Sequence, residues 1–155
     1  RDKGQDHTYY MKMALKEASN AFKNDEVPVG AILIHQDTII GRGYNQCESL
    51  RDPTAHAEMI AITAAANTIE NWRLNECILY VTKEPCAMCA GAIVNARIKM
   101  VIFGCYDENE GCCGSLYQLC GDPRFKVQVT VKGGVLENDC LGIIQEFFQK
   151  KRNKK

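Results

Sequence analysis

The chain has 155 residues, of which 46% are hydrophobic, a composition that suits one folded core and predicts a single domain over residues 1–155. Its 19 basic and 19 acidic residues balance, so no overall positive charge indicates a nucleic-acid-binding protein. We expect no membrane span, because no apolar run reaches about 18 residues. Nine cysteines without an apolar leader favour free thiols in the cytoplasm over a secreted disulfide framework.

The first part of the chain predicts one helix followed by a β-hairpin. Apolar residues recur at helical spacing over residues 7–23, which indicates an amphipathic helix. The apolar, partly β-branched run 27–34 predicts a strand, Gln36-Asp37 a hairpin turn, and residues 38–44 the return strand. A polar loop is expected over 45–53.

Two helix–strand units are expected next. Thr54 is a candidate cap for a helix whose apolar positions begin at Ala57, and residues 77–82 predict a buried strand. A proline then precedes a second helix over 86–96, and residues 99–104 predict another strand.

The last third of the chain predicts a loop over 107–114 and a short helical turn over 115–119. Alternating valines at 127–131 predict a final strand, and apolar spacing over 136–148 predicts a closing helix that runs into a basic tail at 150–155. This order of elements favours an α/β fold with helices on both faces of the sheet and parallel pairing in its second half.

Three side chains have the pattern of a zinc site. Cys86 and Cys89 are three residues apart at a predicted helix start, where the partial positive charge of the helix N-terminus favours thiolates. Two zinc-bound sulfurs lie roughly 3.8 Å apart, a separation that this spacing reaches without distortion. His56, at the other helix start, would supply a nitrogen. Three protein ligands leave the fourth position of one Zn²⁺ per chain open to water, which is the catalytic pattern.

Glu58 is the candidate catalytic residue. Zinc brings the pKa of water towards neutrality, and a nearby carboxylate can take the proton and pass it to a ring nitrogen of a substrate. Hydroxide addition to an amidine carbon and loss of ammonia would complete a hydrolytic deamination. The simpler interpretation is an acid in the first turn of a helix, favoured there by the helix dipole.

Other interpretations of the cysteines stay open. Cys86 and Cys89 could form a redox pair, or a fourth cysteine could complete a structural zinc site, for which Cys105, Cys112 and Cys113 are available. A structural site would leave Glu58 without a role.

Six stretches together carry a resemblance to a known family. They are Glu-Val-Pro-Val-Gly-Ala (26–31), Asp-Pro-Thr-Ala-His-Ala-Glu (52–58), Asn-Trp-Arg-Leu (71–74), Leu-Tyr-Val-Thr (79–82), Glu-Pro-Cys-Ala-Met-Cys-Ala-Gly-Ala (84–92) and Gly-Ser-Leu (114–116). With them the chain resembles the bacterial tRNA-specific adenosine deaminases of the cytidine/deoxycytidylate deaminase superfamily, whose H-x-E and P-C-x-x-C motifs hold zinc. The stretches 71–74 and 114–116 point to the tRNA branch.

The resemblance implies deamination of adenosine to inosine at the wobble position of a tRNA anticodon stem-loop. It also implies a cytidine-deaminase-like three-layer α/β/α sandwich with a mixed sheet of about five strands, and a homodimer whose partner chain helps to form the RNA groove. Carried over by position, Asn45 would bond the target nucleotide, the Ala57 backbone would hold the base, Val29 would line the pocket, and Asp107 would lie beside the ribose. Without the resemblance, Asn45 and Asp107 read as turn residues.

The chain also departs from the family pattern. Glu108, Asn109 and Glu110 stand where a basic residue is common, and Lys83 stands where an apolar residue is common. Cys112-Cys113 replaces small residues, and Arg124-Phe125-Lys126-Val127 replaces the usual Asn-His before the last strand. The basic tail is either a solvated helix end or a contact for tRNA phosphates.

Two alternative functions remain. A deaminase of free bases or nucleosides, of the guanine or cytosine type, would use the same zinc site in a closed pocket. A non-catalytic, zinc-containing RNA-binding subunit is the other, although such a subunit would be expected to lose Glu58.

Overall fold

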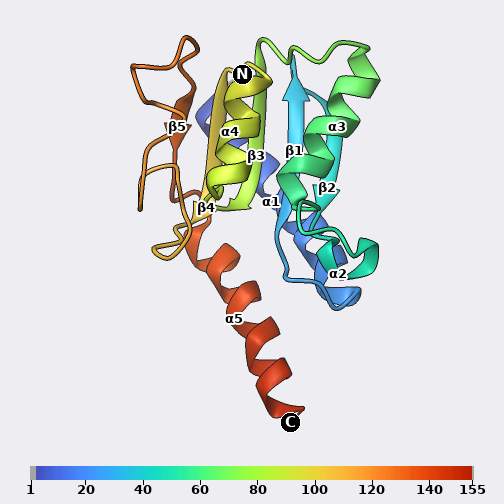
Figure 1. Ribbon diagram of the computed structural model, residues 1–155. Helices are drawn as coiled ribbons and strands as arrows, with labels where there is room; N and C mark the ends of the chain where they lie inside the picture. Colours follow the sequence, from blue (N-terminus) through green and yellow to red (C-terminus); the bar gives the residue numbers. More distant parts are fainter. Residues whose placement is uncertain (1–2, 155) are drawn as a thin grey trace.

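A mixed five-stranded sheet forms the centre of the molecule (Figure 1). The computed structural model describes the backbone of residues 3–154 and the side chains from His7 onwards. The strands lie in the order β2-β1-β3-β4-β5, with β1 antiparallel to β2 and β3, and with β3, β4 and β5 parallel. The bounds are β1 Gly30–His35, β2 Thr38–Tyr44, β3 Cys77–Lys83, β4 Met100–Cys105 and β5 Thr130–Lys132. The predicted α/β class, the parallel second half and the number of strands are confirmed.

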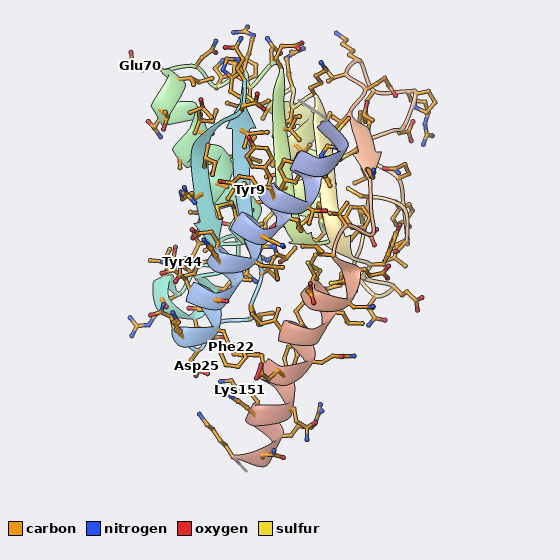
Figure 2. The ribbon with its side chains drawn as sticks, turned by 180° about the vertical axis from the view of Figure 1, so that it is seen from behind. Tyr9, Phe22, Asp25, Tyr44, Glu70 and Lys151 are labelled. Carbon is orange, nitrogen blue, oxygen red and sulfur yellow. The ribbon has the colours of Figure 1, made fainter. Side chains whose placement is uncertain are left out.

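Four helices cover the two faces of this sheet. Helices α3 and α4 pack on one face, and α1 and α5 pack on the other, as the view from behind in Figure 2 shows. The helices are α1 Lys3–Lys23, α2 Cys47–Leu50, α3 Ala57–Ile69, α4 Ala87–Asn95 and α5 Glu137–Asn153. The result is a three-layer α/β/α sandwich.

The alternation of side chains along the strands divides the core between the two faces. Leu33 and Leu79 point towards α3 and α4, whereas their neighbours Ile32 and Tyr80 point towards α1 and α5. All four are almost completely buried. Because both faces of the central strands are covered, these strands read as continuous apolar runs in the sequence.

A glycine sets the distance between α3 and the sheet. A side chain at Gly43 in β2 would collide with the Ala57 carbonyl at the start of α3. Only a residue without a Cβ allows this approach. The first turn of α3, with His56 and Glu58, is therefore held directly against the edge of the sheet.

The predicted hairpin is confirmed, although its first strand begins later than expected. Gln36 and Asp37 both have positive φ, at 50° and 65°, as the favoured two-residue turn requires. Strand β1 begins at Gly30 and not at residue 27. Pro28 has no N–H to donate, which explains why the ladder starts after it.

Three local predictions were wrong. Thr54 does not cap α3: its hydroxyl and N–H both donate to Asp52 Oδ1, and the helix begins one turn later, after His56. Residues 115–119 form no helical turn, because Cys113 and Gln118 make an antiparallel bridge there. The polar loop 45–53 contains the short helix α2.

Two features of the whole chain bear on its chemistry. All nine cysteines are free thiols, and seven of them are buried. In the described part of the chain, no helix combines the length and apolar character needed to cross a bilayer.

Candidate active site

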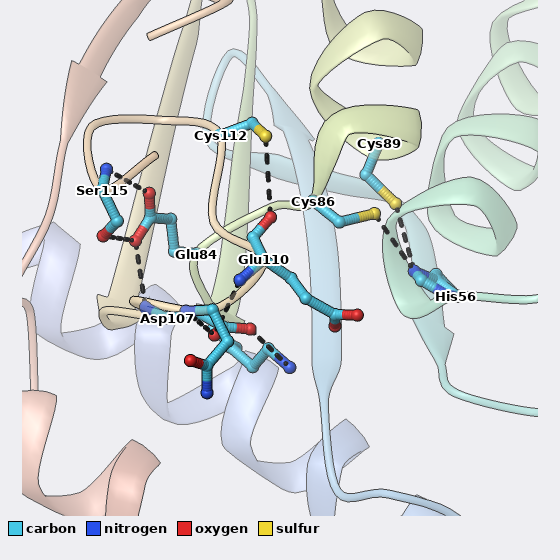
Figure 3. A network of polar contacts seen from close by, with 10 residues as sticks. His56, Glu84, Cys86, Cys89, Asp107, Glu110, Cys112 and Ser115 are labelled. Atoms are coloured by element: carbon cyan, nitrogen blue, oxygen red, sulfur yellow. Dashed lines mark hydrogen bonds and ion pairs between the residues drawn. The ribbon is translucent and has the colours of Figure 1, made fainter. Parts of the chain in front are cut away.

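His56, Cys86 and Cys89 meet at the starts of two helices (Figure 3). His56 is the residue before α3 and Cys86 the residue before α4, and both have extended backbones. The Nδ1 atom of His56 lies 3.6 Å from Cys86 Sγ and 3.6 Å from Cys89 Sγ. We call these three residues the ligand cluster. They come from distant parts of the chain, and they meet because their helices start at the same edge of the sheet.

The electrostatics of the ligand cluster favour one thiolate. Hydrogen bonding from Cys89 and from His56 lowers the pKa of Cys86 to about 3. The same Cys86–Cys89 contact raises the pKa of Cys89, and the hydrogen bond to Cys86 raises the pKa of His56. The cluster therefore favours a thiolate at Cys86.

The donor set fits zinc. Ligand atoms about 2.0–2.3 Å from a tetrahedral zinc ion lie roughly 3.5 Å apart, close to the spacing found here. Among the described side chains, residues 7–154, the three members of the ligand cluster are the one group of this kind whose ligand atoms converge, within 4.8 Å of one another. The cysteines considered as a fourth ligand have other contacts: Cys112 Sγ lies against the Glu110 carbonyl and Cys113 Sγ against Cys120 Sγ.

Glu58 is buried beside the ligand cluster. Its side chain is only 4% exposed, and burial raises the pKa of its carboxyl, with the charge of Cys86 acting in the same direction. It also contacts the Cys89 thiol. A carboxyl with a raised pKa, one residue inside α3, is suited to accept and return a proton.

The predicted substrate residues Asn45, Ala57 and Val29 lie together. Asn45 Oδ1 accepts the Ala57 N–H at 2.8 Å, and the Asn45 N–H donates to the Val29 carbonyl at 3.1 Å. Asn45 thus does the capping that the sequence suggested for Thr54. Val29 is buried, at 4% exposure.

Asp107 lies on the other side of Cys86, at the start of the loop 107–115, which we call the Asp107 loop (Figure 3). Its Oδ2 atom forms an ion pair with Lys83 at 3.1 Å, and its Oδ1 atom accepts the N–H groups of Asn109 and Glu110. Burial alone would raise the pKa of Asp107, but the Lys83 ammonium and these N–H groups outweigh it and hold the pKa below 3.8.

Two buried carboxylates were missed by the sequence reasoning. Glu26 accepts the N–H groups of Glu48 and Ser49 and so fixes α2, and Glu84 accepts three N–H groups of the Asp107 loop. Each is at most 2% exposed. The available signal was an acidic residue beside an apolar run, because such a residue rarely lies in a core without a specific role.

Comparisons with known proteins agree with this geometry. The family model of the MafB19-like deaminases matches residues 5–152. The tRNA-specific adenosine deaminase of Bacillus subtilis is 46% identical over 146 residues, which span 94% of this chain and 91% of that protein. The chain belongs to the tRNA-specific adenosine deaminase family. This membership accounts for the mixed sheet and for the two helix starts that carry the ligand cluster.

Solved structures place the chain in the same family. One from a study of A-to-I editing by tRNA:A34 deaminases at the wobble position of transfer RNA has a TM-score of 0.84 and 38% identity, with 88% of this chain and 99% of that chain covered. Guanine deaminase from Bacillus subtilis has a TM-score of 0.61 and 37% identity, but the match covers 63% of each chain. A guanine deaminase from Nitrosomonas europaea matches 90% of this chain with a TM-score of 0.78 but is only 21% identical, so the fold is shared and sequence identity over the whole length distinguishes the tRNA-specific adenosine deaminases.

Proposed function

We propose that this chain hydrolyses adenosine to inosine and ammonia at the wobble position of a tRNA anticodon loop. One observation carries the proposal: a His/Cys/Cys cluster with a buried carboxyl beside it, in a chain that matches tRNA-specific adenosine deaminases along nearly its whole length. An unpaired loop nucleotide suits so small a protein, because extruding it costs less than flipping a paired base.

His56, Cys86 and Cys89 would hold one zinc ion, which when bound supplies the Lewis acidity that makes water nucleophilic near neutral pH. Glu58 takes a proton from water and delivers it to N1 of the adenine ring as water oxygen bonds to C6. A second proton, again carried by Glu58, reaches the exocyclic nitrogen, and the C6–N bond breaks to release ammonia. Atoms balance: adenosine and water give inosine and ammonia.

The substrate residues proposed are Asn45, Val29, Ala57 and Asp107. In this structure the Ala57 N–H is donated to Asn45 Oδ1, which leaves the amide nitrogen of Asn45 as the group that would face a nucleotide. A hollow of about 660 Å³ next to Asn45 continues to Phe148 and Lys151 on α5. We assign the RNA path to this hollow, with the protein at work in the cytoplasm.

We also propose a homodimer. A groove of about 720 Å³ along α3 and α4 is lined by apolar side chains, including Val94, and by Trp72 and Phe125, which are 54% and 44% exposed. Arg73 lies 4.3 Å above the Trp72 ring and could close the edge of an interface. Sedimentation of the wild type and of Val94→Glu tests this. We expect the wild type to be a dimer and Val94→Glu to be a monomer, and a monomeric wild type would overturn the proposal.

The decisive experiment is mass analysis of nucleosides from a panel of tRNAs and anticodon stem-loops incubated with the zinc-loaded protein. We expect inosine at the wobble position and no ammonia from free guanine, cytosine or their nucleosides. Glu58→Gln, which keeps the ligand cluster, is the control for contaminating activity. Turnover of free bases without inosine in RNA would select the free-base deaminase. Zinc binding and RNA binding without any turnover would select the non-catalytic subunit.

A further inference from the structure

Glu84 is a buried carboxylate around which the Asp107 loop folds (Figure 3). The residue is only 1% exposed, and its side chain accepts four hydrogen bonds from the loop. Oε1 accepts the Asp107 N–H at 3.0 Å and the Ser115 hydroxyl at 2.5 Å, and Oε2 accepts the Cys113 N–H at 3.1 Å and the Ser115 N–H at 2.9 Å. A carboxylate has about four lone-pair sites, so every site has a donor.

The loop wraps closely around this carboxylate. A side chain at Gly111 would collide with the Glu84 carboxyl group and with the Asp107 carbonyl. The loop is also tied to the Cys-x-x-Cys turn itself, because the Cys112 N–H donates to the Pro85 carbonyl at 2.8 Å. The position of the loop is therefore defined relative to the ligand cluster, whose Cys86 follows Glu84 by two residues.

Asp107 is fixed from two directions by consecutive residues. Glu84 holds its backbone N–H, and Lys83 holds its Oδ2 atom at 3.1 Å. Oδ1 accepts the Asn109 and Glu110 N–H groups. Both the position of the residue and the direction of its carboxylate are thereby set before any substrate arrives, which lowers the ordering cost of binding.

We propose that Glu84 is a positioning residue for substrate binding, which places Asp107 and its loop beside the ligand cluster through the Asp107, Cys113 and Ser115 N–H groups. The inference rests on the proposed function, because it takes Asp107 to contact the ribose of the target nucleotide. Glu84 itself touches neither the reacting atoms nor a ligand of the metal; it acts through the loop.

Glu84→Gln tests this role at constant size. A glutamine has an NH2 group in place of one carboxylate oxygen. Half of the four donors therefore lose their acceptor oxygen and face N–H groups. We expect KM for an anticodon stem-loop to rise by at least about tenfold, as the loss of hydrogen bonds to a charged group predicts. We expect kcat within about threefold of wild type and one zinc per chain retained. An unchanged KM, or loss of zinc in parallel with activity, would overturn the proposal.

A double-mutant cycle tests whether the effect passes through Asp107. In a background of Asp107→Ala, Glu84→Gln should raise KM by clearly less than it does in wild type, because the positioned group is gone. An equal effect in both backgrounds contradicts action through Asp107. Glu70→Gln, the same exchange at an exposed position at the far end of α3, is the matched control (Figure 2).

Two measurements keep the test independent of folding and of the proposed function. Ser115→Ala removes one of the four bonds and should raise KM by a smaller factor with an unchanged melting temperature; no change in KM counts against the proposal. Hydrogen exchange at the Cys113 and Ser115 amides should accelerate in Glu84→Gln without any substrate, and unchanged protection contradicts the proposal. If the proposed function is wrong, the wild type forms no inosine, regardless of the hydrogen-exchange rates at these amides.

Discussion

The ligand cluster and the Asp107 loop are neighbours, but different forces hold them. His56 and Cys86 are attached to the first residues of two helices that pack on the sheet, so regular hydrogen bonding fixes them. The Asp107 loop contains no helix, and its shape depends on one buried carboxylate and one ion pair. The difference teaches that, under the proposed function, chemistry and recognition are held by separate contacts: damage to one region should leave the other in place.

The largest effect is expected at the ligand cluster. Glu58→Gln keeps the size of the side chain but cannot accept a proton from water, so kcat should fall by about 10³-fold or more. Zinc content, measured by plasma mass spectrometry, and stem-loop affinity should stay close to wild type. Near-normal turnover with zinc retained would remove Glu58 from the mechanism.

A change in the Asp107 loop should instead impair substrate binding and leave the zinc site in place. Gly111→Ala forces a methyl group against Glu84 and the Asp107 carbonyl, so the loop must shift. Such overpacking costs about 1–3 kcal/mol of stability, and misplaced substrate contacts cost roughly tenfold to a hundredfold in KM. Kinetics with the stem-loop and thermal unfolding measure the two quantities. If zinc is lost as readily as affinity, the two regions are not separable.

A smaller effect is expected from Lys83→Met, which removes the ion pair but not the Glu84 bonds. The two side chains are 30% and 14% exposed, but Asp107 Oδ1 keeps both of its N–H donors, so KM should rise only about two- to fivefold. Without the ammonium, the pKa of Asp107 should rise. Because its folded pKa is lowered in wild type, the stabilisation from the ionised carboxylate is present above pH 3.8 and is lost as the pH falls below that value. A carboxyl NMR titration of both proteins checks the direction, and an unchanged Asp107 pKa contradicts it.

The smallest effect is expected at the basic tail. Lys151 already pairs with Asp25 at 2.9 Å, and Lys150 lies 5.0 Å over the Phe22 ring, so these cations are partly engaged with the end of α1 (Figure 2). Removal of residues 150–155 should weaken RNA binding severalfold and reduce its salt dependence. An identical salt slope would show that the tail is only a solvated helix end.

The sequence predicted the ligand cluster well because its information is local. A Cys-x-x-Cys at a helix start and a histidine two residues before a glutamate have fixed spacing, and apolar periodicity located the strands and helices that carry them. The structure brings these three ligands within hydrogen-bonding distance of one another.

The loop could not be predicted in the same way. Its shape comes from the bonds of Glu84 to backbone N–H groups more than 20 residues away, and backbone groups leave no trace in the residue types of the loop. The helical turn expected over 115–119 was wrong for this reason, since the Ser115 N–H and hydroxyl are committed to Glu84. The prediction of Thr54 as the cap was wrong because Asn45, directly after β2, supplies the acceptor.

The parallel pairing of β3 and β4 places Lys83 opposite Cys105, so both strands leave the sheet at the same level. The Asp107 loop consequently starts at a fixed height whatever its length. New residues could be exchanged at positions 109 and 110, provided that Gly111 and the three N–H donors to Glu84 are kept, and a library built this way would test whether the loop selects the RNA without redesign of the ligand cluster.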